Sequence, residues 1–226
     1  MPSFNLTFAE WSKLWEEARC HIGSFDKVIA LCKTTPRDWQ RADWTGDVGY
    51  RHNHKEGSGP RGEQHIEKQI LQGGVHEVIH DDQRYPFRAI YQKMPLANQA
   101  TGQRVADVFG LLTHRRVVHP VMIEVKTTNR NCWYALVECL QQVRMGRANQ
   151  PNIQNFAKQL GLPKPSGIWG MVLAPTAYIK KSEDSGIMQH CRVLLAKLKP
   201  SNNRIAICKS DELSNHLIRV VESNWS

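Results

Sequence analysis

The apolar residues near the start of the chain recur at helical spacing. They stand three or four positions apart and are Phe8, Trp11, Trp15 and Ala18. Thr7 followed by Glu10 is typical of a capping box, so the pattern predicts an amphipathic helix over residues 7–20. A second helix is predicted over residues 26–33, and residues 35–36 have the composition of a cap and first turn of a third. We interpret the tryptophans of this part as packing between these helices.

Glycine and polar residues interrupt the helical pattern after residue 44. The stretch TGDVGYRHNHKEGSGPR has no apolar periodicity and is typical of a loop. We therefore divide the chain into an N-terminal helical segment over residues 1–50, a loop or linker over residues 51–61 and a main part over residues 62–226.

In the main part the pattern changes from helical spacing to short apolar runs. GEQHIEKQIL predicts a helix, and four runs then predict strands, around residues 75–79, 87–91, 105–112 and 117–125. There follow a helix over 132–147, a strand in GMVLA, a helix in CRVLLAKLK, a strand in RIAIC and a closing helix in DELSNHLIRVVES. This order predicts an α/β fold with a mixed β-sheet flanked by helices. Because THRR between the third and fourth runs has hairpin length, those two strands are expected to be adjacent and antiparallel.

The two strands of this predicted hairpin carry ionisable residues among apolar ones. In PVMIEVKTT, strand alternation presents Glu124 and Lys126 on the same face, roughly 6 to 7 Å apart. In QRVADVFGLL, Asp107 is a lone carboxylate in an apolar run, which is costly unless the group is paired or binds a metal. In a hairpin, Asp107 and Glu124 converge at one end of the sheet and offer hard oxygen ligands to Mg²⁺ or Mn²⁺. The alternative is a half-buried salt bridge to Lys126 or Arg104.

This arrangement resembles the PD-(D/E)xK nuclease superfamily, which includes restriction enzymes and repair nucleases. Asp107 matches the acidic residue of the second core strand, and Glu124-Val125-Lys126 matches the carboxylate-any-lysine element of the third. Alanine replaces the proline that precedes the aspartate in the motif. The resemblance implies a restriction-endonuclease-like core, here with a C-terminal helix and strand extension.

The resemblance also implies a metal site and an activity. Asp107, Glu124 and the carbonyl oxygen of Val125 would hold one Mg²⁺ or Mn²⁺, with Glu63 as a further metal ligand. Lys126 would orient the attacking water or stabilise developing charge. The implied activity is metal-dependent hydrolysis of nucleic-acid phosphodiesters, as in a DNA endonuclease.

The helices around the motif supply further candidate members of the site. The family often has an acidic residue on its first core helix, where Glu63 is our first choice and Glu67 stays open, because Ile66 and Ile70 place both beside the inward face. The helix after the lysine often carries a polar residue near the site, for which the candidates are Glu138, Gln141 and Gln142. A surface position on an amphipathic helix is the alternative for these three.

The charge balance favours a polyanionic partner. Lys and Arg number 30 against 21 Asp and Glu, so the formal net charge is +9 and the pI is about 9.4. We expect a nucleic-acid partner, DNA rather than RNA, and a homodimer if both strands are cut. The candidate contact residues are Arg104, Arg115, Arg116, Gln141, Gln142, Arg144, Lys180 and Lys181.

Two other functions compete with the nuclease. The sequence His76-Glu77-Val78-Ile79-His80 matches the H-E-x-x-H signature of zinc metallopeptidases, which requires a helix. Gly73 and Gly74 precede it and Pro86 follows, so we interpret it as a chance match on a strand. The second alternative is a non-catalytic nucleic-acid-binding protein on the nuclease fold.

The cysteines and the start of the chain bear on its location. The six cysteines are scattered without a C-x-x-C pair, as is typical of reduced cytosolic thiols. The first residues lack the continuous apolar run of a secretory signal or membrane span. We therefore expect a soluble, cytoplasmic protein without a membrane partner.

Overall fold

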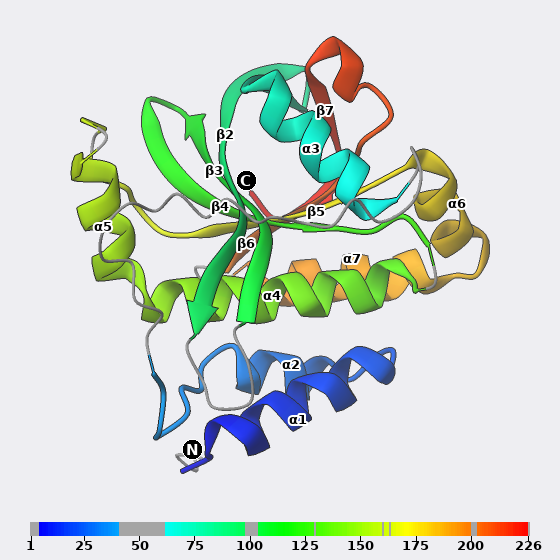
Figure 1. Cartoon of the computed structure of the whole chain (residues 1–226). Helices are drawn as coiled ribbons and strands as arrows, with labels where there is room; N and C mark the ends of the chain where they lie inside the picture. The colour runs from blue at the N-terminus through cyan, green and yellow to red at the C-terminus, as the bar shows by residue number, and fades with distance from the viewer. Residues whose placement is uncertain are drawn as a thin grey trace.

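The computed structural model of the chain (Figure 1) describes residues 5–40, 62–97, 104–128, 130–159, 161–162, 164–199 and 203–225. The predicted loop or linker over residues 51–61 lies outside these ranges, as do residues 41–50 and the side chain of Arg104. The helices are α1 (Phe8–Cys20), α2 (Phe25–Leu31), α3 (Glu63–Gly73), α4 (Cys132–Ala148), α5 (Gln150–Gln159), α6 (Thr176–Asp184) and α7 (Ile187–Leu198), with a 3₁₀ turn, η1, at Leu213–Asn215. The strands are β1 (Val75–His80), β2 (Gln83–Ala97), β3 (Arg104–His114), β4 (Val117–Val125), β5 (Trp169–Ala174), β6 (Arg204–Lys209) and β7 (Leu217–Ser223).

The seven described strands form one mixed sheet that closes into a barrel in the order β1 to β7. Strands β1 to β4 pair antiparallel, β4, β5 and β6 pair parallel, and β7 runs antiparallel to β6. Parallel pairing of β7 with β1 closes the barrel. The predicted α/β fold with a mixed sheet and flanking helices is therefore confirmed. The closed sheet differs from the open sheet of restriction endonucleases.

The closing helix predicted in DELSNHLIRVVES is wrong, and the error explains the closure. This segment forms the 3₁₀ turn η1 and then strand β7. Its residues Ile218, Val220 and Val221 are β-branched and suit a pleated sheet better than a helix. Pairing with both β6 and β1 then leaves neither side of β7 open.

The third helix predicted from residues 35–36 is also absent from the described chain. Residues 34–40 form turns and extended segments instead. The carboxylate of Asp38 accepts a hydrogen bond from the backbone nitrogen of Phe8 at 2.6 Å. Asp38 therefore pairs with a backbone N–H group at the start of α1 and is not part of a third helix. The capping box predicted for α1 is confirmed by reciprocal bonds between Thr7 and Glu10.

The helices form layers on the two sides of the sheet. In Figure 1, α4 and α7 lie beneath the sheet, α1 and α2 form a further layer below α4, and α3 lies on the opposite side. One apolar cluster joins the helices α1, α2, α4 and α7 to the sheet, and it includes Trp11, Trp15 and Trp133. A second cluster joins α3 to the other sheet face around Phe87 and Ile123. The N-terminal helices thus share a core with the main part.

Two glycines, Gly146 on α4 and Gly170 on β5, allow α4 to lie close to the strands that it covers. A Cβ atom at Gly146 would lie 2.7 Å from Cε of Met122 on β4. One at Gly170 on β5 would lie 2.8 Å from Cγ2 of Val143 on α4. Real side chains do not tolerate such contacts without movement of the backbone or neighbours. The small residues therefore set the distance at which polar side chains of α4 meet β4.

Within the described residues, no helix is long and apolar enough to cross a membrane. All six cysteines are present as free thiols, and Cys20 is the exposed one. Burial raises the pKa of the Cys132 thiol to about 11 and that of the Cys32 thiol to about 12. These two buried thiols are therefore protonated and unreactive at neutral pH.

Candidate active site

The β3–β4 hairpin brings Asp107 and Glu124 to the same end of the sheet. Val108 on β3 lies opposite Ile123 on β4, so the predicted antiparallel pairing of these strands is confirmed. The Oδ2 atom of Asp107 accepts a hydrogen bond from the backbone nitrogen of Val125 at 2.9 Å. The Asp107 carboxylate therefore lies beside the backbone that carries the Glu124-Val125-Lys126 element.

Glu124 is held on the face of β4 that α4 covers. Its side chain is buried, with 2% of the residue surface exposed. Nζ of Lys126 donates to Oε1, and Nε2 of Gln142 on α4 donates to Oε2. Burial raises the pKa of Glu124 well above its usual value, and the charges of Asp107 and Glu138 add to the rise. The site therefore concentrates negative charge in a poorly solvated place.

Lys126 lies between two carboxylates. Besides its bond to Glu124, its Nζ atom is 3.1 Å from Oε2 of Glu138 on α4. Burial alone would lower the pKa of Lys126, but the charges of Glu124 and Glu138 outweigh it and raise the pKa above the usual range. Lys126 is therefore a fixed cation at neutral pH, not a base.

Arg19 of α1 completes this network from the N-terminal layer. Its Nη1 atom donates to Oε1 of Glu138 at 2.7 Å, and only 6% of the residue is exposed. Burial would raise the pKa of Glu138, but Lys126 and Arg19 help to lower it. Arg19 was not identified from the sequence, although a signal was present. It follows Trp15 by four positions, so a charged residue stands on the apolar face of α1.

Tyr178 of α6 lies within electrostatic reach of the cluster of ionisable side chains, which consists of Asp107, Glu124, Lys126 and Glu138. Its hydroxyl is buried and has no hydrogen-bond partner among the described residues. Burial raises the pKa of this hydroxyl, and the charges of Glu63 and Glu124 raise it further while Lys126 lowers it. Those three groups therefore lie within electrostatic reach of the phenol. This residue was also not identified from the sequence.

The two candidate carboxylates of α3 have different surroundings. Glu67 is buried and accepts a hydrogen bond from Nε2 of Gln92 on β2 at 2.6 Å. Glu63 is the first residue of α3, and its charge acts on Tyr178. Glu63 therefore lies within electrostatic reach of Tyr178.

The donor types of the cluster suit a divalent cation. Asp107, Glu124 and Glu138 offer the hard carboxylate oxygens that Mg²⁺ and Mn²⁺ prefer. In the part of the chain that the structure describes, no three His, Cys, Asp or Glu side chains are grouped to hold a metal ion. Lys126 instead balances Glu124 and Glu138. The carboxylate oxygens are thus of the type that binds such an ion. In this structure, Lys126 supplies the positive charge that balances them.

The candidate nucleic-acid contacts do not form one surface. Arg115 and Arg116 are exposed at the β3–β4 turn, eight strand residues and therefore roughly 27 Å from Asp107. Lys180 and Lys181 are exposed on α6, which also carries Tyr178. Gln141 and Gln142 are buried, and Arg144 lines a separate pocket. Lys180 and Lys181 are thus exposed candidates on α6, whereas Gln142 contacts Glu124 itself from α4.

The H-E-x-x-H sequence lies on strand β1, as predicted. Four strand residues span roughly 13 Å, so His76 and His80 do not share a helical turn. Nε2 of His76 is 2.8 Å from the carbonyl oxygen of Ile70, and Nε2 of His80 is 2.8 Å from Oγ of Ser223. Glu77 pairs with Arg84 at 2.6 Å. The segment therefore lacks the helical geometry that a zinc peptidase requires.

Comparison with known protein families, with characterised proteins and with solved structures found no match for this chain. Relatives therefore assign no function to the cluster. Its function has to be inferred from the side chains that meet at Glu124 and from their chemistry.

Proposed function

We propose that this chain is a metal-dependent nuclease that hydrolyses phosphodiesters of nucleic acid, with DNA favoured over RNA. One observation carries the proposal. Asp107 and Glu124 lie on paired strands at one end of the sheet, and Lys126 and Gln142 both contact Glu124. The chain has the order α3, β1, β2, β3, β4, α4, α5 and β5. With β1 and α5 taken as additions to a core that the closed barrel extends, this order supports a relation to the PD-(D/E)xK superfamily.

Each residue of the cluster has a role in this proposal. Asp107, Glu124 and the Val125 carbonyl would hold Mg²⁺ or Mn²⁺, with Glu63 nearby. The ion, when bound, would supply positive charge to the scissile phosphate. Lys126 would orient water and stabilise negative charge on the phosphate oxygens.

The surrounding side chains would hold these groups in place. Gln142 fixes the Glu124 carboxylate from α4. Glu138 holds Lys126, and Arg19 in turn holds Glu138. Such a chain of polar contacts restricts the reacting groups to one geometry, which is how a protein lowers the reorganisation needed during reaction. The hydroxyl of Tyr178 is a further donor beside the cluster.

A second candidate function is nucleic-acid binding without cleavage. The specific observation that favours it is that Lys126 and Gln142 already occupy both oxygens of Glu124. If this pairing persists with substrate bound, Lys126 stays as the counter-charge of Glu124 in place of a metal ion. Such a protein would bind nucleic acid with strong salt dependence and cut nothing.

The test is incubation of the purified full chain with circular duplex DNA, linear duplex DNA, single-stranded DNA and RNA, in Mg²⁺, Mn²⁺ or EDTA. We expect metal-dependent cutting that falls at least about a hundredfold in Asp107→Asn and Lys126→Met. Asp26→Asn and Lys158→Met, at exposed positions on α2 and α5, are the matched controls. Undiminished cutting by Asp107→Asn would refute the proposed site, and salt-dependent binding without cutting would favour the second function.

A further inference from the structure

A pocket of about 510 Å³ lies beside the C-terminal end of α4, apart from the cluster around Glu124. Arg144, in its lining, follows Gln142 by two positions, which is about 200° around the helix axis. Gln142 reaches Glu124 on the sheet side, so Arg144 lies on the opposite side of α4. The principal polar side chains of the lining come from the segment after α2, from α4 and from α5: Thr35, Trp39, Arg144, Arg147, Gln150 and Gln154.

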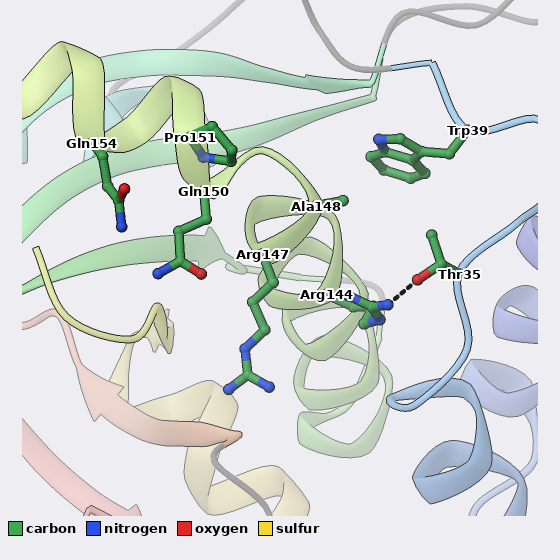
Figure 2. Close-up of a pocket in the computed structure, with 8 residues that line it drawn as sticks. All are labelled: Thr35, Trp39, Arg144, Arg147, Ala148, Gln150, Pro151 and Gln154. Atoms are coloured by element: carbon green, nitrogen blue, oxygen red, sulfur yellow. Dashed lines mark hydrogen bonds between the residues drawn. The ribbon is translucent and has the colours of Figure 1, made fainter.

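The pocket has a strongly positive lining. Two of its eight lining residues are arginines, and none is acidic. Figure 2 shows Trp39 and Thr35 on one side, the two glutamines on the other and the arginines between them. Two guanidinium groups in one concave surface, with no acidic side chain among the eight residues that line it, favour an anion electrostatically.

Arg144 is held in this place by the segment after α2. Nε of Arg144 donates to the carbonyl oxygen of Thr34 at 3.0 Å, and its Nη2 donates to Oγ1 of Thr35, drawn as a dashed line in Figure 2. Burial lowers the pKa of both guanidinium groups, and the charge of Arg144 lowers that of Arg147 further. Arginine stays charged at neutral pH all the same, so this environment would be stabilised by a bound anion.

The remaining lining residues suit a flat, polar group. Trp39 packs against Phe8 and Trp11, with ring centroids 5.6 and 6.1 Å apart, and is half-buried. Its buried Nε1 has no hydrogen-bond partner among the described residues. Aromatic rings next to cationic side chains are a common platform for bases of nucleic acid. The amides of Gln150 and Gln154 offer both donors and acceptors for a base edge.

We propose that this pocket binds a nucleotide, with its phosphate at Arg144 and Arg147 and its base against Trp39. The nucleotide belongs either to a nucleic-acid strand or to a free mononucleotide, which share this chemistry. An arginine in the last turn of α4 also balances the helix dipole, but that role needs neither the second guanidinium nor the tryptophan. The inference does not rest on cleavage at Asp107.

The test measures binding by isothermal titration calorimetry in EDTA, so that no cleavage is required. The probes are deoxyadenosine monophosphate, deoxyadenosine, inorganic phosphate and a short single-stranded oligonucleotide. We expect the mononucleotide, the oligonucleotide or both to bind the full chain more tightly than deoxyadenosine. Arg147→Gln should weaken that binding at least about tenfold, or 1.4 kcal/mol. Trp39→Leu should weaken the binding of the nucleotide probes but not the binding of inorganic phosphate.

The controls separate pocket contacts from net charge and from misfolding. Lys158→Gln removes one charge from an exposed position on α5 outside the pocket, and we expect it to change binding less than twofold. Gln154→Ala is a milder second variant if Trp39→Leu melts early. If the oligonucleotide binds and the mononucleotide does not, the pocket binds a nucleotide within a nucleic-acid strand. If the mononucleotide binds, the pocket also accepts a free nucleotide. The proposal is overturned if neither the mononucleotide nor the oligonucleotide binds. It is also overturned if Arg147→Gln and Lys158→Gln lose equal amounts of binding affinity.

Discussion

Arg19 on α1 donates a hydrogen bond to Glu138 on α4 at 2.7 Å, and the other carboxylate oxygen of Glu138 lies 3.1 Å from Nζ of Lys126. The N-terminal helical layer therefore contributes to the position of the lysine in the candidate site. Arg19 touches no group proposed to react, so its role is positioning. The same layer is fixed by a hydrogen bond of 3.0 Å from Nε1 of Trp133 to the carbonyl oxygen of Ala18.

Removal of the Arg19 guanidinium should damage both stability and activity. Arg19→Met leaves a largely buried Glu138 with one cation fewer, and the loss of one partner of a buried pair costs about 3 kcal/mol. We expect the free energy of unfolding in urea to fall by this amount and the proposed nuclease activity to fall about tenfold. Because the proposed positioning role acts through Lys126, the loss should appear in kcat more than in KM.

The control for this variant is a similar pair at the surface. Arg192 on α7 lies 2.6 Å from Glu222, and its side chain is 45% exposed. Arg192→Met should cost less than about 1 kcal/mol, because exposed pairs contribute little. Similar costs for the two variants would mean that Arg19 forms an ordinary surface pair and does not stabilise the site.

We expect the buried carboxylate of Glu124 to lower the stability of the folded state, although the proposed cleavage requires it. Its carboxylate is buried beside Asp107 and Glu138, and like charges in a poorly solvated place destabilise the folded state. Glu124→Gln keeps the shape. Its carbonyl oxygen can still accept from Lys126, and its amide nitrogen can donate to Oε1 of Gln142 once the Gln142 amide turns over. We therefore expect Tm in EDTA to rise by a few degrees while cleavage is lost.

Metal addition gives the second part of this prediction. A ligand that binds the folded state raises Tm by mass action, so Mg²⁺ should raise Tm of the unsubstituted chain. The same addition should leave Tm of Glu124→Gln unchanged. A Mg²⁺ shift of equal size in both proteins would place the ion away from Glu124.

The parts of the fold that follow local patterns could be predicted from the sequence. The capping box of α1 and the β3–β4 hairpin depend on residues close together in the chain, and both are as expected. Closure of the barrel depends on pairing of β7 with β1, for instance Ile218 with Val78. No local pattern carries that information, because the partners are distant in sequence and the helical spacing of Leu213, Leu217 and Val220 suggests another structure.

The candidate site divides in the same way. Asp107, Glu124 and Lys126 lie on neighbouring strands, so alternation and the hairpin were enough to place them together. Arg19 is 119 positions before Glu138 and meets it only because α1 packs on α4. Tyr178 comes from α6, which the sequence analysis did not predict as a helix. Side chains that enter a site through tertiary packing leave at most a weak local signal.

His76 makes stability depend on pH. It is fully buried, a carbonyl oxygen faces its Nε2, and its Nδ1 has no partner among the described residues. Burial lowers the pKa of this imidazole below the ordinary value of 6.5. When the pH falls below that value the unfolded chain gains a proton that the folded chain does not, so the free energy of unfolding decreases. Above it, this contribution to stability is fully present.

The prediction is a loss of stability on acidification that His76→Gln reduces. One proton contributes at most about 1.4 kcal/mol per pH unit. Urea unfolding at about pH 7.5 and about pH 5.5 should show a smaller difference in His76→Gln than in the unsubstituted chain. His21→Gln, at an exposed position just after α1, is the control and should leave the difference unchanged. Equal differences in all three proteins would exclude His76 as a source of the effect.

The β3–β4 turn contains a local strain that substitution can relieve. Arg115 and Arg116 have φ angles of 49° and 67°, in the left-handed region that two-residue hairpin turns require. Residues with a Cβ atom pay about 1 to 2 kcal/mol for this conformation, whereas glycine adopts it readily and asparagine often does. Arg115→Asn with Arg116→Gly should therefore raise the free energy of unfolding by about 1 kcal/mol.

The same double variant tests whether the turn binds nucleic acid. Each phosphate that the protein no longer neutralises should reduce the slope of log K against log salt by about 0.9. We expect the slope to stay unchanged, because the turn is roughly 27 Å from Asp107 along β3. The control is Asp81→Asn with Asp82→Gly in the β1–β2 turn, where φ is 48° and 59°. Aspartate tolerates the left-handed region better than arginine, so this pair should gain less stability. A reduced slope in the arginine variant alone would show that the turn binds phosphate.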